Sequence, residues 1–323
     1  MLKKILFSAL KNFKFSYAGQ KKDFGITAVC FHRISDEIDY AYPCMPVHTF
    51  HGVIEYFSQN YSIILPNDIG KPTPKPKLII TFDDGYKDFY TNALPILIKF
   101  NASAIMNLVV DSLLTGENFW TQKISQLVNH KLKLGETLKI AYNDIEYNFT
   151  ITPKNSERVS LEICSILSEI LMEKRMEIID DLIEKTAPLD RLKMMNTNDV
   201  KECLKNNISI GSHSYTHDNL TLKSTEEHLH KEIIESKAIL EKTLNTKIES
   251  FAFPSGKNKV ELYQFLINAG YKNAFTTEDK IYTPIPNSKI NVIPRIILYG
   301  SSVDENILRT NLFHARIKKI LNK

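Results

Sequence analysis

The sequence predicts an α/β fold built around a parallel sheet. Short apolar stretches alternate with amphipathic helical stretches along most of the 323 residues, as expected when each strand returns to the sheet through a helix. The clearest strand is Leu78-Ile79-Ile80, an aliphatic run after the Pro-rich segment 72–76. Such a run indicates a strand that is buried on both faces. The sheet is expected to be either open or closed into a barrel.

Composition and charge are those of a globular protein that does not bind nucleic acid. Hydrophobic residues make up 43% and charged residues 24% of the chain, which is ordinary for a soluble domain. A net charge of +4 is too small and too evenly spread for a nucleic-acid partner. The four Cys residues show no paired spacing, so we expect free thiols in a reducing compartment.

The first 24 residues are predicted to form a basic helix. Residues 1–22 contain six Lys and no acidic residue, with Leu2, Leu6 and Leu10 at helical spacing. The apolar part is too short for a signal peptide or a membrane span, which favours a cytoplasmic protein. The helix is expected either to cover the domain or to rest on an anionic membrane surface.

From residue 25 onward the pattern predicts a domain that extends to residue 300. Its first half should contain a strand at 25–34, a helix at 48–61 with Thr49 as its cap, the strand before Asp83, a helix at 92–100 and a strand at 102–110. Its second half should contain helices at 199–206, 226–244 and 260–269, and strands at 208–211, 250–253, 273–277 and 293–296. A basic helix is expected within residues 301–323.

Residues 115–190 interrupt this alternation and are interpreted as an insertion packed on the main domain. Residues 137–151 alternate apolar and polar side chains about an Asn-Asp pair, which indicates a β-hairpin. Residues 157–186 form a long charged stretch with helical periodicity.

Polar residues at two strand ends point to a metal site. Asp83 and Asp84 follow the buried strand directly, and adjacent buried carboxylates are costly unless a cation is near. His213 and His217 follow another strand; on a first helical turn their spacing puts both rings on one face, suited to a shared metal. Parallel folds bring such strand ends to one rim. Zn²⁺ is the expected ion, although Co²⁺ or Ni²⁺ would fit the same ligands.

Three motifs resemble those of a known family. Residues 81–86 (TFDDGY) and 213–217 (HSYTH) are similar to the first two signature motifs of the polysaccharide deacetylases, the NodB-homology carbohydrate esterases, and residues 251–256 (FAFPSG) are similar to the third. The resemblance covers roughly residues 25–110 and 190–300. It implies a distorted (β/α) barrel and metal-dependent removal of N-acyl groups from amino sugars.

The resemblance also implies roles for individual residues. Asp83 would be the general base, and Asp84, His213 and His217 would bind the metal. Ser255, after Pro254, stands where the family has a Tyr whose backbone N–H helps to hold the oxyanion.

Two positions depart from the family pattern. Ala252 replaces the Arg that pairs with the base, and either Arg295 or Arg33 is expected to supply that charge. No His follows a late Leu-rich strand, but His32 ends an early buried strand, as in a permuted branch of the family. His32 would then be the general acid, with a pKa near neutrality; the alternative is an ordinary core His.

Aromatic side chains near these motifs are candidates for sugar binding. Tyr86 and Phe253, with Tyr215, could line a sugar subsite. Trp120 could stack on a sugar or anchor the insertion.

The resulting functional hypothesis is an N-deacetylase of a polysaccharide or of a lipid-linked glycan precursor. The basic N-terminus would suit a membrane-bound substrate. Removal of another acyl group, such as formyl, is an alternative within the class. A catalytically inactive glycan-binding protein on the same fold is the alternative from another class.

Overall fold

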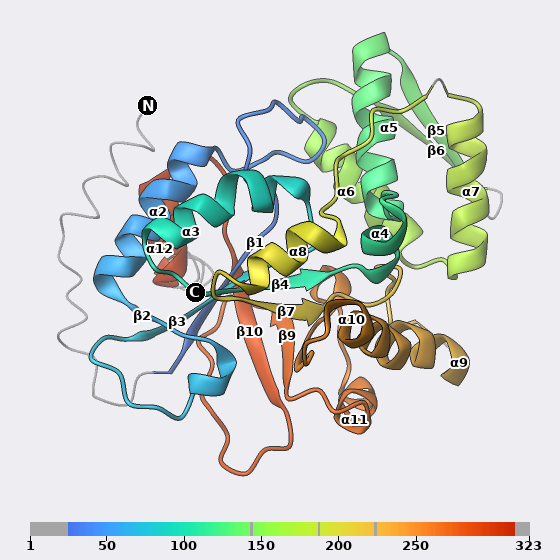
Figure 1. Cartoon of the computed structure of the whole chain (residues 1–323). Helices are drawn as coiled ribbons and strands as arrows, with labels where there is room; N and C mark the ends of the chain where they lie inside the picture. Colours follow the sequence, from blue (N-terminus) through green and yellow to red (C-terminus); the bar gives the residue numbers. More distant parts are fainter. Residues whose placement is uncertain (1–24, 143–144, 187, 223–224, 314–323) are drawn as a thin grey trace, which may run out of the picture.

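The fold is a closed barrel of parallel strands with helices outside it (Figure 1). A computed structural model describes residues 25–142, 145–186, 188–222 and 225–313. The strands of the ring, in spatial order, are β1 (Thr27–Phe31), β10 (Asn291–Ile297), β9 (Asn273–Thr277), β8 (Ser250–Ala252), β7 (Ile208–Ser212), β4 (Ala104–Leu108) and β3 (Lys77–Phe82). β1 pairs with both β10 and β3, which closes the ring. The expected distorted barrel is confirmed.

The pairing of β1 with β3 sets the positions of the polar residues that follow both strands. The two strands run parallel in register from Thr27 opposite Leu78 to Phe31 opposite Phe82. Their ends are therefore level, so that His32 and Asp83 begin their loops side by side. A short strand, β2 (Ser62–Ile63), pairs with the beginning of β3.

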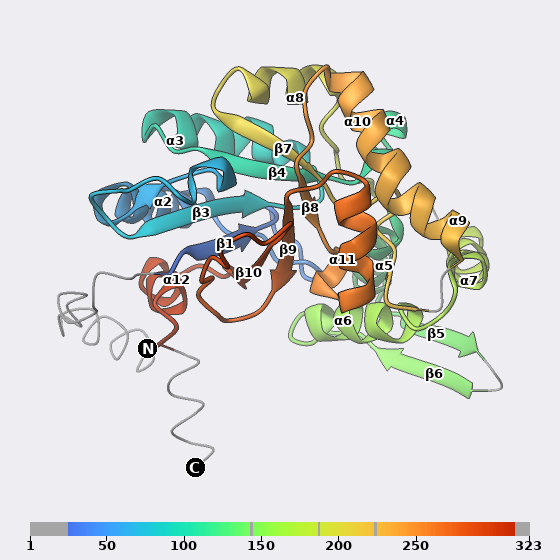
Figure 2. The ribbon, with the colours of Figure 1, turned by 90° about the horizontal axis from the view of Figure 1, so that it is seen from below.

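Helices cover the outer face of the barrel, as Figure 2 shows from a second direction. They are α2 (Val47–Asn60), α3 (Leu94–Lys99), α4 (Val110–Thr115), α8 (Thr197–Leu204), α9 (Glu226–Leu229), α10 (Ser236–Leu244), α11 (Val260–Asn268) and α12 (Val303–Thr310). Single π-helical turns at Phe89–Ala93 and His230–Glu235 lead into α3 and α10. Between strands and helices lies a core rich in Phe, in which Phe82 contacts the rings of Phe31, Phe50 and Phe89.

The predicted insertion folds around a hydrophobic cluster of its own. It consists of α5 (Trp120–Leu134), the hairpin strands β5 (Thr137–Tyr142) and β6 (Ile145–Thr150), α6 (Ser156–Leu167) and α7 (Met172–Glu184). In Figure 1 it lies on the side toward which the arrowheads of β4 and β7 point. The insertion therefore borders the carboxyl ends of the strands.

Several expectations about helices are corrected by the structure. The stretch 157–186 is two helices, α6 and α7, separated at residues 168–171. Thr49 does not cap α2, because the residue before that helix is Pro46 and Thr49 is buried in its first turn. The helix predicted within residues 301–323 is not continuous: α12 ends at Thr310, and Leu312 has a left-handed backbone with φ of 56°.

The predicted N-terminal helix and residues 314–323 of the predicted C-terminal helix lie outside the described residues. In the described part of the chain, every helix is too short or too polar to cross a bilayer.

Candidate metal centre

Three of the predicted residues meet at the carboxyl ends of β3 and β7. Oδ1 of Asp84 lies 3.5 Å from Nε2 of His213 and 3.7 Å from Nε2 of His217. All three side chains are buried, and one potential ligand atom from each lies within 4.8 Å of the others. The structure therefore gathers two imidazoles and a carboxylate around one point, the donor set typical of zinc and similar ions.

A loop, and not a helical turn, brings the two His rings together. Ser214 and His217 both have left-handed backbones, with φ of 66° and 64°, which an α-helix cannot contain. The Ser214 hydroxyl accepts a hydrogen bond of 3.0 Å from the His217 N–H and closes the turn. The prediction of a shared ligand face agrees with the observed placement, but the expected helical geometry was wrong.

The same residues fit a divalent cation on electrostatic grounds. Oδ1 of Asp84 is buried and has no hydrogen-bond partner among the described residues. Burial, together with the neighbouring Asp83 carboxylate, raises the pKa of Asp84 well above its usual value, a cost that a bound cation would remove. Burial also lowers the pKa of His213 and of His217, which favours the neutral rings that bind metals.

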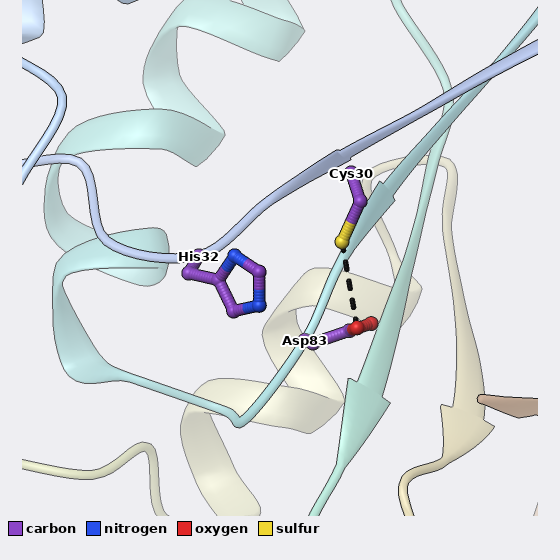
Figure 3. Close-up of side chains that lie close together, drawn as sticks. All are labelled: Cys30, His32 and Asp83. Carbon is purple, nitrogen blue, oxygen red and sulfur yellow. Dashed lines mark hydrogen bonds between the residues drawn. The ribbon is translucent and has the colours of Figure 1, made fainter. Parts of the chain in front are cut away.

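Asp83 lies beside this cluster and is held by donors from three strands. Arg295 on β10 donates to both of its oxygens at 2.7 Å, and Asn107 on β4 donates to Oδ1 at 2.7 Å. The Cys30 thiol on β1 donates to Oδ2 at 3.4 Å (Figure 3). Burial alone would raise the pKa of Asp83, but the Arg295 guanidinium lowers it well below its usual range. Asp83 is therefore ionised.

The choice between the two candidate arginines is decided by these contacts. Arg33 pairs instead with Asp88 at 3.0 Å and Asp39 at 2.8 Å. Arg295 faces Asp83 because β10 is the other strand that pairs with β1.

Asn107 and Cys30 were not predicted from the sequence. Both lie within apolar strands and belong to no motif. In the register of the sheet, Met106 lies opposite Phe82 and Cys30 lies opposite Thr81. This register brings Asn107 and Cys30 to the level of Asp83 in the barrel. The single polar residue in the stretch Ala104–Leu108 was the one available signal.

His32, the residue after β1, reaches the same carboxylate. A ring nitrogen of His32, the Cys30 sulfur and an Asp83 oxygen lie within 4.8 Å of one another, and Figure 3 shows His32 and Cys30 directed toward Asp83. These three are a poor cation site, because Arg295 already supplies positive charge there. Burial lowers the pKa of His32 to about 4, so the expected value near neutrality was wrong.

A cavity of about 340 Å³ opens over these residues. Its walls include Tyr86 and Ser255, together with Ser125, Glu157, Ser160 and Leu161 of the insertion. Ser255 has a left-handed backbone with φ of 54°. The cavity is therefore bordered by both the barrel and the insertion.

Three of the other candidates lie elsewhere. Phe253 is fully buried against Phe251 and Tyr263 and does not line the cavity, so its proposed place in a sugar subsite was wrong. Pro254 is buried in the turn before Ser255 and is also absent from the cavity wall. Trp120 is 4% exposed and donates from Nε1 to the His217 carbonyl at 2.8 Å, so it anchors the insertion and does not present its face to the cavity.

A family model described as polysaccharide deacetylase matches residues 152–274. The poly-beta-1,6-N-acetyl-D-glucosamine N-deacetylase of Escherichia coli K12 is 30% identical over 89 residues, which is 25% of this chain and 13% of that protein. The Staphylococcus aureus MRSA252 protein of the same name is 26% identical over 133 residues, which is 39% of this chain and 45% of that protein. The matched segments thus span less than half of either relative.

Solved structures show the same fold over most of the chain. Streptococcus pyogenes deacetylase PplD in complex with acetate is 18% identical, with a TM-score of 0.60 over 90% of this chain and 99% of that one. IcaB from Ammonifex degensii is 15% identical, with a TM-score of 0.56 over 89% and 97% of the two chains. The chain is thus similar to polysaccharide deacetylases, by a family model over residues 152–274 and by its fold over most of its length.

Proposed function

We propose that this protein is a metal-dependent hydrolase that removes N-acetyl groups from amino sugars of a polysaccharide or of a lipid-linked glycan precursor. The observation that carries the proposal is an ionised carboxylate beside a complete ligand set. Oδ2 of Asp83 lies 3.8 Å from Nε2 of His213, while Asp84, His213 and His217 point to a common centre. A binding protein has no need for an unligated base at that place.

The proposed roles follow from the charges and positions of the side chains. A metal held by Asp84, His213 and His217 would polarise the acyl carbonyl and make an attacking water more acidic. Asp83 takes a proton from that water as the water oxygen forms a bond to the acyl carbon. Arg295 keeps Asp83 ionised and fixes its orientation.

The remaining steps complete the hydrolysis. His32 is neutral at pH 7 because of its low pKa, so we assign it to relay the proton from Asp83 to the leaving amine. Asp83 holds that proton weakly, since its own pKa is lowered. The C–N bond breaks, and the products are the free amine and acetate. The backbone N–H of Ser255, at the cavity wall, is the proposed donor to the oxyanion.

Metal content and product release test this proposal together. Wild type should bind about one Zn²⁺ (or Co²⁺ or Ni²⁺) per chain, and Asp84→Ala should lose it. Wild type should release acetate from N-acetylglucosamine oligomers, while Asp83→Asn and His32→Ala should lower kcat by about 10²- to 10⁴-fold. Absence of metal from wild type would refute the proposal.

Two alternatives are distinguished by the same experiment. Metal without acetate release, but with formate release from N-formyl sugars, would indicate a deformylase. Metal without any turnover, together with glycan binding, would indicate a catalytically inactive binding protein. Contact of the N-terminal residues with a membrane remains a prediction.

A further inference from the structure

We propose that Phe119, the residue before the insertion's first helix α5, and Trp120, the first residue of that helix, position His217 for metal binding. This inference rests on the proposed metal-dependent function. It adds that the metal site is completed by the insertion and not by the barrel alone.

The two metal-binding imidazoles are supported differently. Nδ1 of His213 lies 2.8 Å from the Ala252 carbonyl, a hydrogen bond that orients the ring and directs Nε2 toward Asp84. Such a partner on the far nitrogen is the usual support of a metal-binding His. Nδ1 of His217 is buried and has no hydrogen-bond partner among the described residues. The orientation of the His217 ring must come from another contact.

Phe119 supplies that contact. Its ring stacks on the His217 ring with a centroid distance of 4.5 Å and an interplanar angle of 28°. A flat neighbour at this distance prevents rotation of the imidazole about χ2, which would otherwise turn Nε2 away from Asp84.

Trp120 holds the backbone of the same residue. Its Nε1–H donates 2.8 Å to the carbonyl of His217, whose left-handed φ of 64° is unfavourable for a residue with a side chain. The hydrogen bond stabilises this backbone conformation.

Trp120 is in turn held from within the insertion. The guanidinium of Arg175 on α7 lies 4.4 Å from the centre of the Trp120 ring and pairs with Asp218, the residue after His217. Arg175 is fully buried. Ring, backbone and following residue of His217 are thus all contacted by the insertion.

Zinc affinity in a competition titration against a chromophoric chelator tests the inference without relying on activity. Phe119→Leu and Trp120→Phe should each bind Zn²⁺ about 10- to 100-fold more weakly than wild type, the usual effect of losing the support of a ligand. Phe149→Leu is the matched control, because Phe149 is buried in the insertion's own cluster and is not among the residues around His217. It should bind Zn²⁺ within about twofold of wild type. Thermal melts of the metal-free proteins establish that each variant is folded.

The tryptophan provides a spectroscopic readout. Trp120 is the only Trp in the sequence, so its emission should change as Zn²⁺ binds to wild type and to Phe149→Leu. In Phe119→Leu the change should move to higher Zn²⁺ concentration, and in Asp84→Ala it should vanish.

Two results would overturn the inference. One is zinc affinity of wild-type strength in both Phe119→Leu and Trp120→Phe; the other is an equal loss of affinity in Phe149→Leu, which would indicate general loosening of the insertion. Either result would leave the proposed function intact, because wild type and Asp84→Ala decide that question separately. Failure of wild type to bind zinc would refute both.

Discussion

Replacement of Arg295 by Met should expose how much of the site's architecture depends on one ion pair. Both members are buried, at 1% exposure for Arg295 and 3% for Asp83, and two bonds of 2.7 Å join them. Removing one partner of such a pair leaves an uncompensated buried charge and costs about 3–5 kcal/mol. We therefore expect Arg295→Met to lower the free energy of unfolding at pH 7 by about that amount.

The loss of stability in Arg295→Met should depend on pH. In wild type the folded pKa of Asp83 is lowered, so the stability from this group is present above the unfolded pKa of about 3.9 and is lost as pH falls below it. Without Arg295, burial should raise the folded pKa of Asp83, and protonation should then relieve the buried charge. The difference in unfolding free energy between wild type and Arg295→Met should therefore shrink as pH falls from 7 toward 4.

Urea unfolding followed by Trp120 emission in the presence of a chelator measures this difference without a contribution from bound metal. The double variant Asp83→Asn/Arg295→Met is the control, because it leaves no buried charge from the pair. Its loss of unfolding free energy should be smaller, by at least about 1 kcal/mol, than the sum of the losses in Asp83→Asn and Arg295→Met. A loss below about 1 kcal/mol in Arg295→Met, or strict additivity, would refute the reasoning.

Three further predictions concern the surroundings of the site. Asn107→Ala removes the 2.7 Å donor to Asp83 and should lower kcat about 10- to 100-fold, since a hydrogen bond to a charged group contributes roughly 1.5–3 kcal/mol; unchanged kcat with full metal content would contradict this. Gly211→Ala places a Cβ 2.2 Å from Oδ1 of Asn107 and should lower the free energy of unfolding by about 1–3 kcal/mol, which a thermal melt would show as a lower Tm. Gly70→Ala, whose Cβ would meet nothing within 4 Å, should leave Tm unchanged. The Asp218 carboxylate, whose Oδ2 lies 3.0 Å from Nε2 of His228, raises the pKa of His228 against the opposing effect of burial. The wild type should therefore be more stable than His228→Gln by up to about 1 kcal/mol below pH 6.5. That advantage should disappear as pH rises above the folded pKa; an equal advantage at pH 8.5 would contradict the assignment.

The sequence alone determined the fold class and most of the proposed site, because these depend on local patterns. Alternation of buried strands with amphipathic helices predicts a parallel sheet, and parallel sheets place the residues after their strands at one rim. Asp83 and Asp84 follow β3 directly, His213 follows β7 directly, and His217 lies four residues beyond His213. Their meeting in space therefore required no knowledge of which strands are neighbours.

Only the tertiary structure decided which side chains surround those residues. Arg295 reaches Asp83, and Arg33 does not, because closure of the barrel sets β10 against β1. Asn107 is level with Asp83 through the register of β3 and β4, and Phe119 stacks on His217 across nearly a hundred residues of chain. Register and closure arise from the packing of segments distant in sequence, and no local pattern of residues records them.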